Sequence, residues 1–123
     1  MKKVLIIEDN IEIRENTAEL LELSNYLVIT AENGNIGFEM AKAYKPDVIL
    51  CDMMMPESDG RDFLKLAKED DFVSNIPLVF FSAGSLSSEV RGGLIEDATY
   101  YLQKPFTEEE LILSMQRILN VNK

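Results

Sequence analysis

The sequence predicts an α/β fold in which a doubly wound parallel sheet carries helices on both faces. Three observations lead to this prediction. Apolar residues form continuous runs at 4–7, 48–51 and 77–81, as is typical of strands buried on both faces. Helical patterns lie between the runs, so that strand and helix alternate five times, which favours a parallel sheet. The length of 123 residues suits one compact domain, and we expect residues 1–123 to form it.

The expected elements follow in chain order. Besides the three apolar runs, weaker ones predict strands at residues 26–31 and 100–102. Apolar residues at spacings of three and four predict helices at 11–23, 35–44, 60–69 and 86–97. Asn10 or Asp9 could cap the first helix, and Gly92-Gly93 weakens the fourth. Thr107 and Glu110 form a capping box before the last helix, whose apolar stripe comprises Leu111, Ile112, Met115, Ile118 and Leu119.

Composition excludes several classes of protein. With 12 basic and 22 acidic residues the net charge is −10, which argues against direct nucleic-acid binding. The chain has no histidine, and this excludes histidine-based acid–base catalysis and the commonest zinc sites. Cys51 is the only cysteine, so no internal disulfide can form and a reducing cytoplasm is expected. We expect Cys51 to be a buried apolar residue of a strand, in preference to a redox sensor. Without a long apolar run, no membrane span or signal peptide is expected.

Polar residues come directly after the predicted strands. In open parallel sheets ligands bind at the carboxyl ends of the strands, so these residues should meet at one edge. They are three acids, a hydroxyl and a lysine: Glu8, Asp9, Asp52, Ser82 and Lys104. Each has a simpler explanation, such as helix capping for the first aspartate, turn formation for Asp52 and Ser82, or a solvated lysine. Clustered carboxylates repel one another, however, and Mg²⁺ prefers such oxygen ligands, so together they favour a cation site.

These motifs resemble the receiver domain of two-component response regulators, the family related to the chemotaxis response regulator. The resemblance covers the whole chain and is carried by Ile7-Glu8-Asp9, Asp52-Met53-Met54-Met55-Pro56 with Gly60, Ser82-Ala83, and Tyr101 to Phe106. It implies a flavodoxin-like (βα)5 fold with a five-stranded parallel sheet of strand order 2-1-3-4-5. Two positions depart from the family pattern, because Ser82 replaces the commoner threonine and Asp97 stands in place of a glycine.

The resemblance also implies roles for individual residues. Asp52 would be the phosphoacceptor, and Mg²⁺, or alternatively Mn²⁺, would be held by Glu8, Asp9, Asp52 and the main-chain carbonyl of Met54. The residues expected to bind the phosphoryl group or to switch with it are Ser82, Ala83, Lys104 and Tyr101. A cis peptide bond is expected before Pro105, and Pro56 and Gly60 would shape the loop after Asp52.

The function implied by this resemblance is a phosphorylation-activated signalling switch. A cognate histidine kinase or phosphotransfer protein would donate the phosphoryl group, and the domain would catalyse only its own phosphorylation and dephosphorylation. The face formed by the fourth helix, fifth strand and fifth helix would then contact a downstream protein or output domain. The domain would be a monomer or a phosphorylation-dependent dimer. It would stand alone or belong to a longer regulator, for which a receiver preceding a DNA-binding domain is favoured.

Two other functions fit a parallel α/β sheet less well. A Mg²⁺-dependent phosphatase or hydrolase with an aspartate nucleophile usually has a second aspartate two residues after the first, where this chain has Met54. A flavin carrier needs a phosphate-binding loop after the first strand, but Glu8-Asp9-Asn10 is acidic and lacks glycine. The sequence therefore favours the signalling switch.

Overall fold

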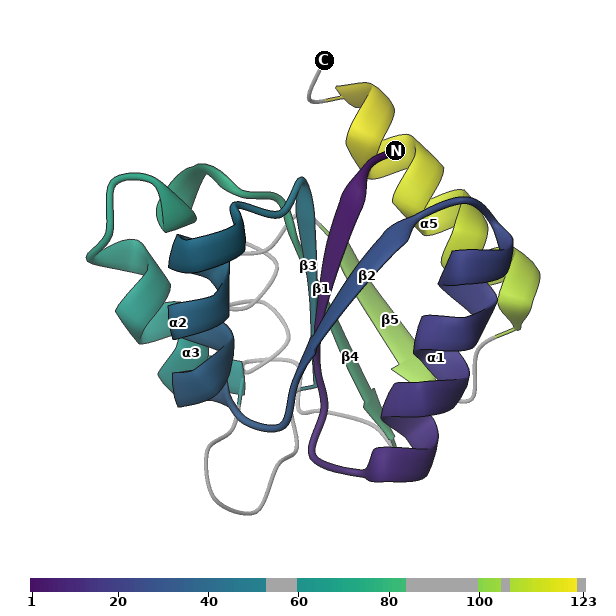
Figure 1. The fold of residues 1–123 in the computed structure, drawn as a ribbon, viewed down its shortest axis with the longest axis horizontal. Helices are drawn as coiled ribbons and strands as arrows, with labels where there is room; N and C mark the ends of the chain where they lie inside the picture. The colour runs from purple at the N-terminus through teal and green to yellow at the C-terminus, as the bar shows by residue number, and fades with distance from the viewer. Residues whose placement is uncertain (53–59, 84–99, 105–106, 122–123) are drawn as a thin grey trace.

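A five-stranded parallel sheet forms the centre of the protein (Figure 1). The computed structural model describes residues 1–52, 60–83, 100–104 and 107–121. The strands are β1 (Lys3–Ile7), β2 (Leu27–Ala31), β3 (Val48–Asp52), β4 (Leu78–Ala83) and β5 (Tyr100–Lys104). The helices are α1 (Ile11–Leu23), α2 (Gly34–Tyr44), α3 (Gly60–Lys68), the short 3-10 helix η1 (Val73–Asn75) and α5 (Glu108–Val121). The strand order is β2-β1-β3-β4-β5, which confirms the predicted topology.

Helices cover both faces of the sheet, with α1 and α5 on one side and α2 and α3 on the other (Figure 1). Because successive side chains of a strand point to opposite faces, each strand contributes to both hydrophobic layers. In β1, Leu5 and Ile7 pack in the layer under α2 and α3, while Val4 and Ile6 pack in the layer under α1 and α5. Residues 4–7 of this strand are therefore all apolar, which explains the continuous run in the sequence.

The helix starts follow local capping rules. Asn10 is extended and its side chain accepts a 3.0 Å hydrogen bond from the main-chain N–H of Ile13, so Asn10 caps α1. Asn33 caps α2 in the same way, with a 2.9 Å bond from Ile36. The predicted capping box is present before α5, because the N–H of Glu110 donates to Thr107 Oγ1 over 3.0 Å and the N–H of Thr107 donates back to Glu110 Oε1 over 3.2 Å.

Several predicted boundaries differ from the structure. Ser82 and Ala83 were expected to follow the fourth strand and Lys104 the fifth, but Ser82 pairs with Gln103 and Ala83 pairs with Lys104 inside the sheet. Main-chain hydrogen bonds carry this pairing, so strands continue past the end of their apolar residues. No helix was predicted at residues 73–75, which form η1, and Asp70 Oδ1 accepts 2.9 Å bonds from the N–H groups of Phe72 and Val73 at its start. The helix predicted at 86–97 lies outside the described residues.

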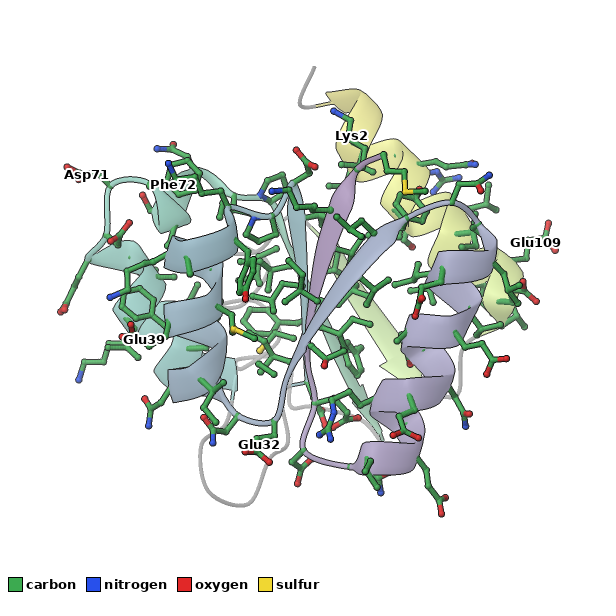
Figure 2. The ribbon with its side chains drawn as sticks, in the orientation of Figure 1. Lys2, Glu32, Glu39, Asp71, Phe72 and Glu109 are labelled. Carbon is green, nitrogen blue, oxygen red and sulfur yellow. The ribbon has the colours of Figure 1, made fainter. Side chains whose placement is uncertain are left out.

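Charged side chains cover the outer surface. Glu39, Asp71 and Glu109 point away from the sheet on opposite sides of the molecule, and Glu32 lies at the end of the sheet where β2 finishes (Figure 2). Across the described part of the chain, no helix combines the length and apolar character needed to cross a membrane. Cys51 is fully buried in β3, as predicted for an apolar strand residue.

Candidate functional site

Three carboxylates meet at the carboxyl ends of β1 and β3. Glu8 and Asp9 follow β1, Asp52 is the last residue of β3, and β1 and β3 are adjacent parallel strands with Ile7 paired to Cys51. One carboxylate oxygen from each of Glu8, Asp9 and Asp52 lies within 4.8 Å of the other two. Glu8 is only 1% exposed and Asp52 only 4%, whereas Asp9 is exposed. The strand ends thus bring together three acids from distant parts of the chain, since Glu8 and Asp52 are 44 residues apart in the sequence.

The electrostatics of this acidic cluster, defined as Glu8, Asp9 and Asp52, disfavour full ionisation. The pKa of Asp9 is raised above 3.8, first by desolvation and then by the hydrogen bond and the negative charge of Glu8. Main-chain N–H groups of Asp9 and Asn10 act in the opposite direction and lower the pKa of Asp9. A cation bound between the carboxylates would relieve this repulsion, since it favours their charged forms.

The donor set of the acidic cluster fits a hard divalent cation. Carboxylate oxygens are the ligands that Mg²⁺ prefers, and Mg²⁺ usually takes one or two of them together with water and phosphate oxygens. The buried positions of Glu8 and Asp52 and the exposed position of Asp9 leave one side of the cluster toward solvent. Carboxylates without histidine or cysteine favour Mg²⁺ or Mn²⁺ over zinc. The cluster therefore fits the metal that the sequence predicts.

The loop that carries Glu8 and Asp9 is held by its neighbours on both sides. The N–H of Glu8 donates a 3.0 Å hydrogen bond to the carbonyl of Ala31 at the end of β2. The carbonyl of Glu8 accepts a 2.9 Å bond from Nη1 of Arg14, which lies on α1. Arg14 was not predicted as a site residue. The sequence of a helix does not indicate that one of its polar side chains bonds to the main chain at the end of the preceding strand.

Of the other predicted residues, Ser82 and Ala83 end β4 and Lys104 ends β5, at the same edge of the sheet. Tyr101 lies farther from this edge, near the start of β5, where it pairs with Phe80. Asp52 pairs with Phe81 in the sheet, so Ser82 is one residue beyond the position next to Asp52. Gly60 is the first residue of α3. Met54, Pro56 and Pro105 lie outside the described residues, and their expected roles stay predictions.

Comparison with known proteins agrees with this geometry. Residues 4–116 match the family model of the response regulator receiver domain. The chain is 34% identical over 121 residues to hybrid signal transduction histidine kinase D of Dictyostelium discoideum, covering 98% of this chain and 8% of the kinase. It is 32% identical over 118 residues to the phosphate regulon transcriptional regulatory protein PhoB of Pseudomonas aeruginosa, covering 96% of this chain and 52% of that protein.

Solved structures give the same result. Vibrio cholerae chemotaxis protein CheY4 superposes with a TM-score of 0.89 at 32% identity, with 97% of this chain and 99% of that chain covered. A Francisella response regulator receiver domain superposes with a TM-score of 0.88 at 28% identity over the full length of both chains. The chain thus spans about half of PhoB and a small part of the kinase, but nearly the whole of these receiver structures. The protein belongs to the response regulator receiver domain family of two-component signal transduction systems.

Proposed function

We propose that Asp52 is the residue that accepts the phosphoryl group, and that residues 1–123 form one receiver domain around it. The observation that carries this proposal is the acidic cluster, in which Asp52 ends a fully buried strand within 4.8 Å of oxygens of Glu8 and Asp9. A buried strand fixes the position of its last residue. Asp52 is the member of the cluster that lies within a strand, whereas Glu8 and Asp9 follow β1 and Asp9 is exposed, so we infer that Asp52 serves as the nucleophile.

The reaction is a transfer of PO₃ between two nucleophiles. A carboxylate oxygen of Asp52 attacks the phosphorus of a phosphohistidine or of acetyl phosphate, and the bond from phosphorus to the donor atom breaks with its electron pair on the donor. When bound, Mg²⁺ offsets the charge of the phosphoryl oxygens and of the carboxylates. Glu8 and Asp9 are the residues that would hold it beside Asp52, with the carbonyl of Met54 as a further ligand.

The register of the sheet supports roles for residues of β4 and β5. Ser82 and Lys104 lie at the carboxyl ends of two strands that follow β3 in the sheet, the edge to which Asp52 also belongs. A hydroxyl and an ammonium group at that edge suit binding of a phosphoryl group, as hydrogen-bond donor and counter-charge. Ala83 would contribute main-chain contacts, and Tyr101 would change conformation with Ser82.

Partners follow from the family. The phosphoryl donor would be a histidine kinase or a phosphotransfer protein, and the face of β5 and α5, with the helix expected before β5, would contact the output partner. We further propose that the domain acts in the cytoplasm, uses Mg²⁺ with Mn²⁺ as a substitute, and catalyses only its own phosphorylation and dephosphorylation. The family match favours this switch over the hydrolase considered from the sequence.

Phosphorylation by acetyl phosphate tests the assignment of Asp52. The protein is incubated with acetyl phosphate and Mg²⁺, and intact-mass spectrometry should detect one added phosphoryl group. Asp52→Asn should show none, because an amide does not provide the attacking carboxylate oxygen. Asp71→Asn is the matched control, because Asp71 is an exposed aspartate on another part of the surface (Figure 2). It should be phosphorylated like the wild type.

Two results would contradict the proposal. Phosphoryl uptake by a folded Asp52→Asn variant would show that another residue is the acceptor. Continuous release of inorganic phosphate from a phosphomonoester, at many turnovers per protein, would indicate the hydrolase with an aspartate nucleophile instead.

A further inference from the structure

Arg14 makes two hydrogen bonds that enclose the exposed member of the acidic cluster. Its Nη1 atom donates to the carbonyl of Glu8 over 2.9 Å, and its main-chain N–H donates to the carbonyl of Asn10 over 2.9 Å. The first bond reaches the residue before Asp9 and the second reaches the residue after it. One arginine thus connects both ends of the three-residue segment that carries Glu8 and Asp9.

The two bonds differ in what they require from the side chain. The bond from N–H to Asn10 belongs to the first turn of α1, and any residue other than proline could make it at this position. The bond to Glu8 requires a long side chain with a terminal donor that reaches back from α1 to the end of β1. Arg14 is partly buried, and a guanidinium carries only hydrogen-bond donors and no acceptor. It can therefore serve as a permanent donor to this carbonyl.

The bond from Arg14 completes the anchoring of Glu8. The N–H of Glu8 is held by Ala31 of β2 and its carbonyl by Arg14 of α1, so elements on two sides fix the two peptide groups that flank the Cα of Glu8. Because the bond goes to a main-chain carbonyl, it orients the loop without using a carboxylate oxygen. A loop fixed in this way presents its carboxylates in one arrangement, which lowers the entropic cost of binding a cation.

We propose that Arg14 is a positioning residue, which fixes the segment from Glu8 to Asn10 and so prepares the acidic cluster for Mg²⁺. This inference rests on the proposed metal-dependent function of the cluster. Arg14 also places a positive charge near the acids, and that charge alone would oppose cation binding. The two effects have opposite signs. If positioning dominates, removing Arg14 raises the Kd for Mg²⁺, and if charge repulsion dominates, it lowers that Kd.

Mg²⁺ titration by isothermal calorimetry tests this role. Arg14→Met keeps an unbranched side chain but removes the donor, and it should raise the Kd for Mg²⁺ by about tenfold. Arg14→Lys keeps a charged donor without the planar fork, and it should raise the Kd by about threefold. At saturating Mg²⁺, both variants should be phosphorylated by acetyl phosphate at close to the wild-type rate, because Arg14 does not contact the reacting atoms.

Two control variants exclude other causes. Arg117→Met removes the same charge from an exposed position on α5 and should leave the Kd unchanged. Thr107→Ala removes a helix cap elsewhere and lowers stability, and it should also leave the Kd unchanged. Circular dichroism verifies that each variant is folded. If Arg14→Met does not fold, Arg14→Lys replaces it, with its smaller expected loss of affinity.

The outcomes separate this inference from the proposed function. If the wild type does not bind Mg²⁺, or if Asp9→Asn binds it equally well, the metal site itself is wrong. If the wild type binds Mg²⁺ but Arg14→Met binds it with unchanged or tighter Kd, the site stands and the positioning role is wrong. If Thr107→Ala weakens Mg²⁺ binding as much as Arg14→Met does, general loss of stability explains both results, and the positioning role of Arg14 is wrong.

Discussion

Gly37 of α2 lies directly against Ile7, the last residue of β1, and a Cβ at position 37 would come within 2.7 Å of Ile7 Cγ1. Ile7 is fully buried and immediately precedes Glu8 and Asp9. The absence of a side chain at Gly37 therefore allows α2 to approach the strand that carries two residues of the acidic cluster.

Gly37→Ala should destabilise the protein. Overpacking of a close contact costs about 1–3 kcal/mol, although the higher helix propensity of alanine returns up to about 1 kcal/mol. We expect a net loss in the free energy of unfolding, measured by urea denaturation. Mg²⁺ binding should weaken as well, since Ile7 must shift to admit the new methyl group. Ile7→Val removes Cδ1, so Gly37→Ala should cost less stability in the Ile7→Val background than in the wild type. An equal cost in both backgrounds would show that the contact with Ile7 is not the cause.

Neutralising Asp9 should stabilise the metal-free protein. The pKa of Asp9 in the folded state lies above 3.8, so the folded protein holds this proton more tightly than the unfolded chain does. The stability associated with the protonated form is present below pH 3.8 and is lost as the pH rises through the raised pKa. At pH 7 the Asp9 carboxylate is therefore unfavourable, and Asp9→Asn should unfold at a higher temperature than the wild type in the presence of EDTA.

The control for this measurement is Glu19→Gln, which removes one negative charge from an exposed position of α1. It should change the melting temperature less than Asp9→Asn does. The wild type should also lose stability more steeply than Asp9→Asn as the pH is raised from 3.8. A melting temperature of Asp9→Asn at or below that of the wild type at pH 7 would show that desolvation and the neighbouring Glu8 do not disfavour the Asp9 carboxylate.

Removing the metal should lower stability and stop phosphorylation together. A ligand that binds only the folded state adds about 1.4 kcal/mol of stability at ten times its Kd. EDTA should therefore lower the melting temperature from its value in excess Mg²⁺, and acetyl phosphate should no longer phosphorylate the protein. Asp52→Asn and Asp9→Asn should gain less stability from Mg²⁺ than the wild type. Equal Mg²⁺ stabilisation in all three proteins would indicate that the cation binds elsewhere.

Thr107→Ala should destabilise α5 without affecting the site. The Thr107 hydroxyl accepts the N–H of Glu110 at 3.0 Å, and loss of such a cap costs about 1 kcal/mol. Ser114 lies on the same helix, where its hydroxyl donates to the carbonyl of Glu110 over 2.9 Å. Because this bond competes with helix hydrogen bonding, Ser114→Ala should be close to neutral. Urea denaturation should separate the two variants. Equal stability of both would mean that the capping box contributes nothing.

The sequence alone determined much of the fold. The helix predicted at 11–23 is observed with the same bounds, because an asparagine cap and an apolar stripe are local signals. Every predicted strand is present, and the continuous apolar runs of β1 and β3 reflect burial on both faces of the sheet. The meeting of Glu8, Asp9 and Asp52 was also predictable, since the carboxyl ends of adjacent parallel strands share one edge.

Only the tertiary structure decided the contacts between elements. The strand ends at Ala83 and Lys104 depend on main-chain pairing, which side-chain polarity does not report. The contact between Gly37 and Ile7 depends on how closely α2 approaches β1. The bond from Arg14 to Glu8 depends on where α1 lies relative to the end of the strand. Local patterns specify which residues form each element, but the distances between elements arise when those elements pack around a common core.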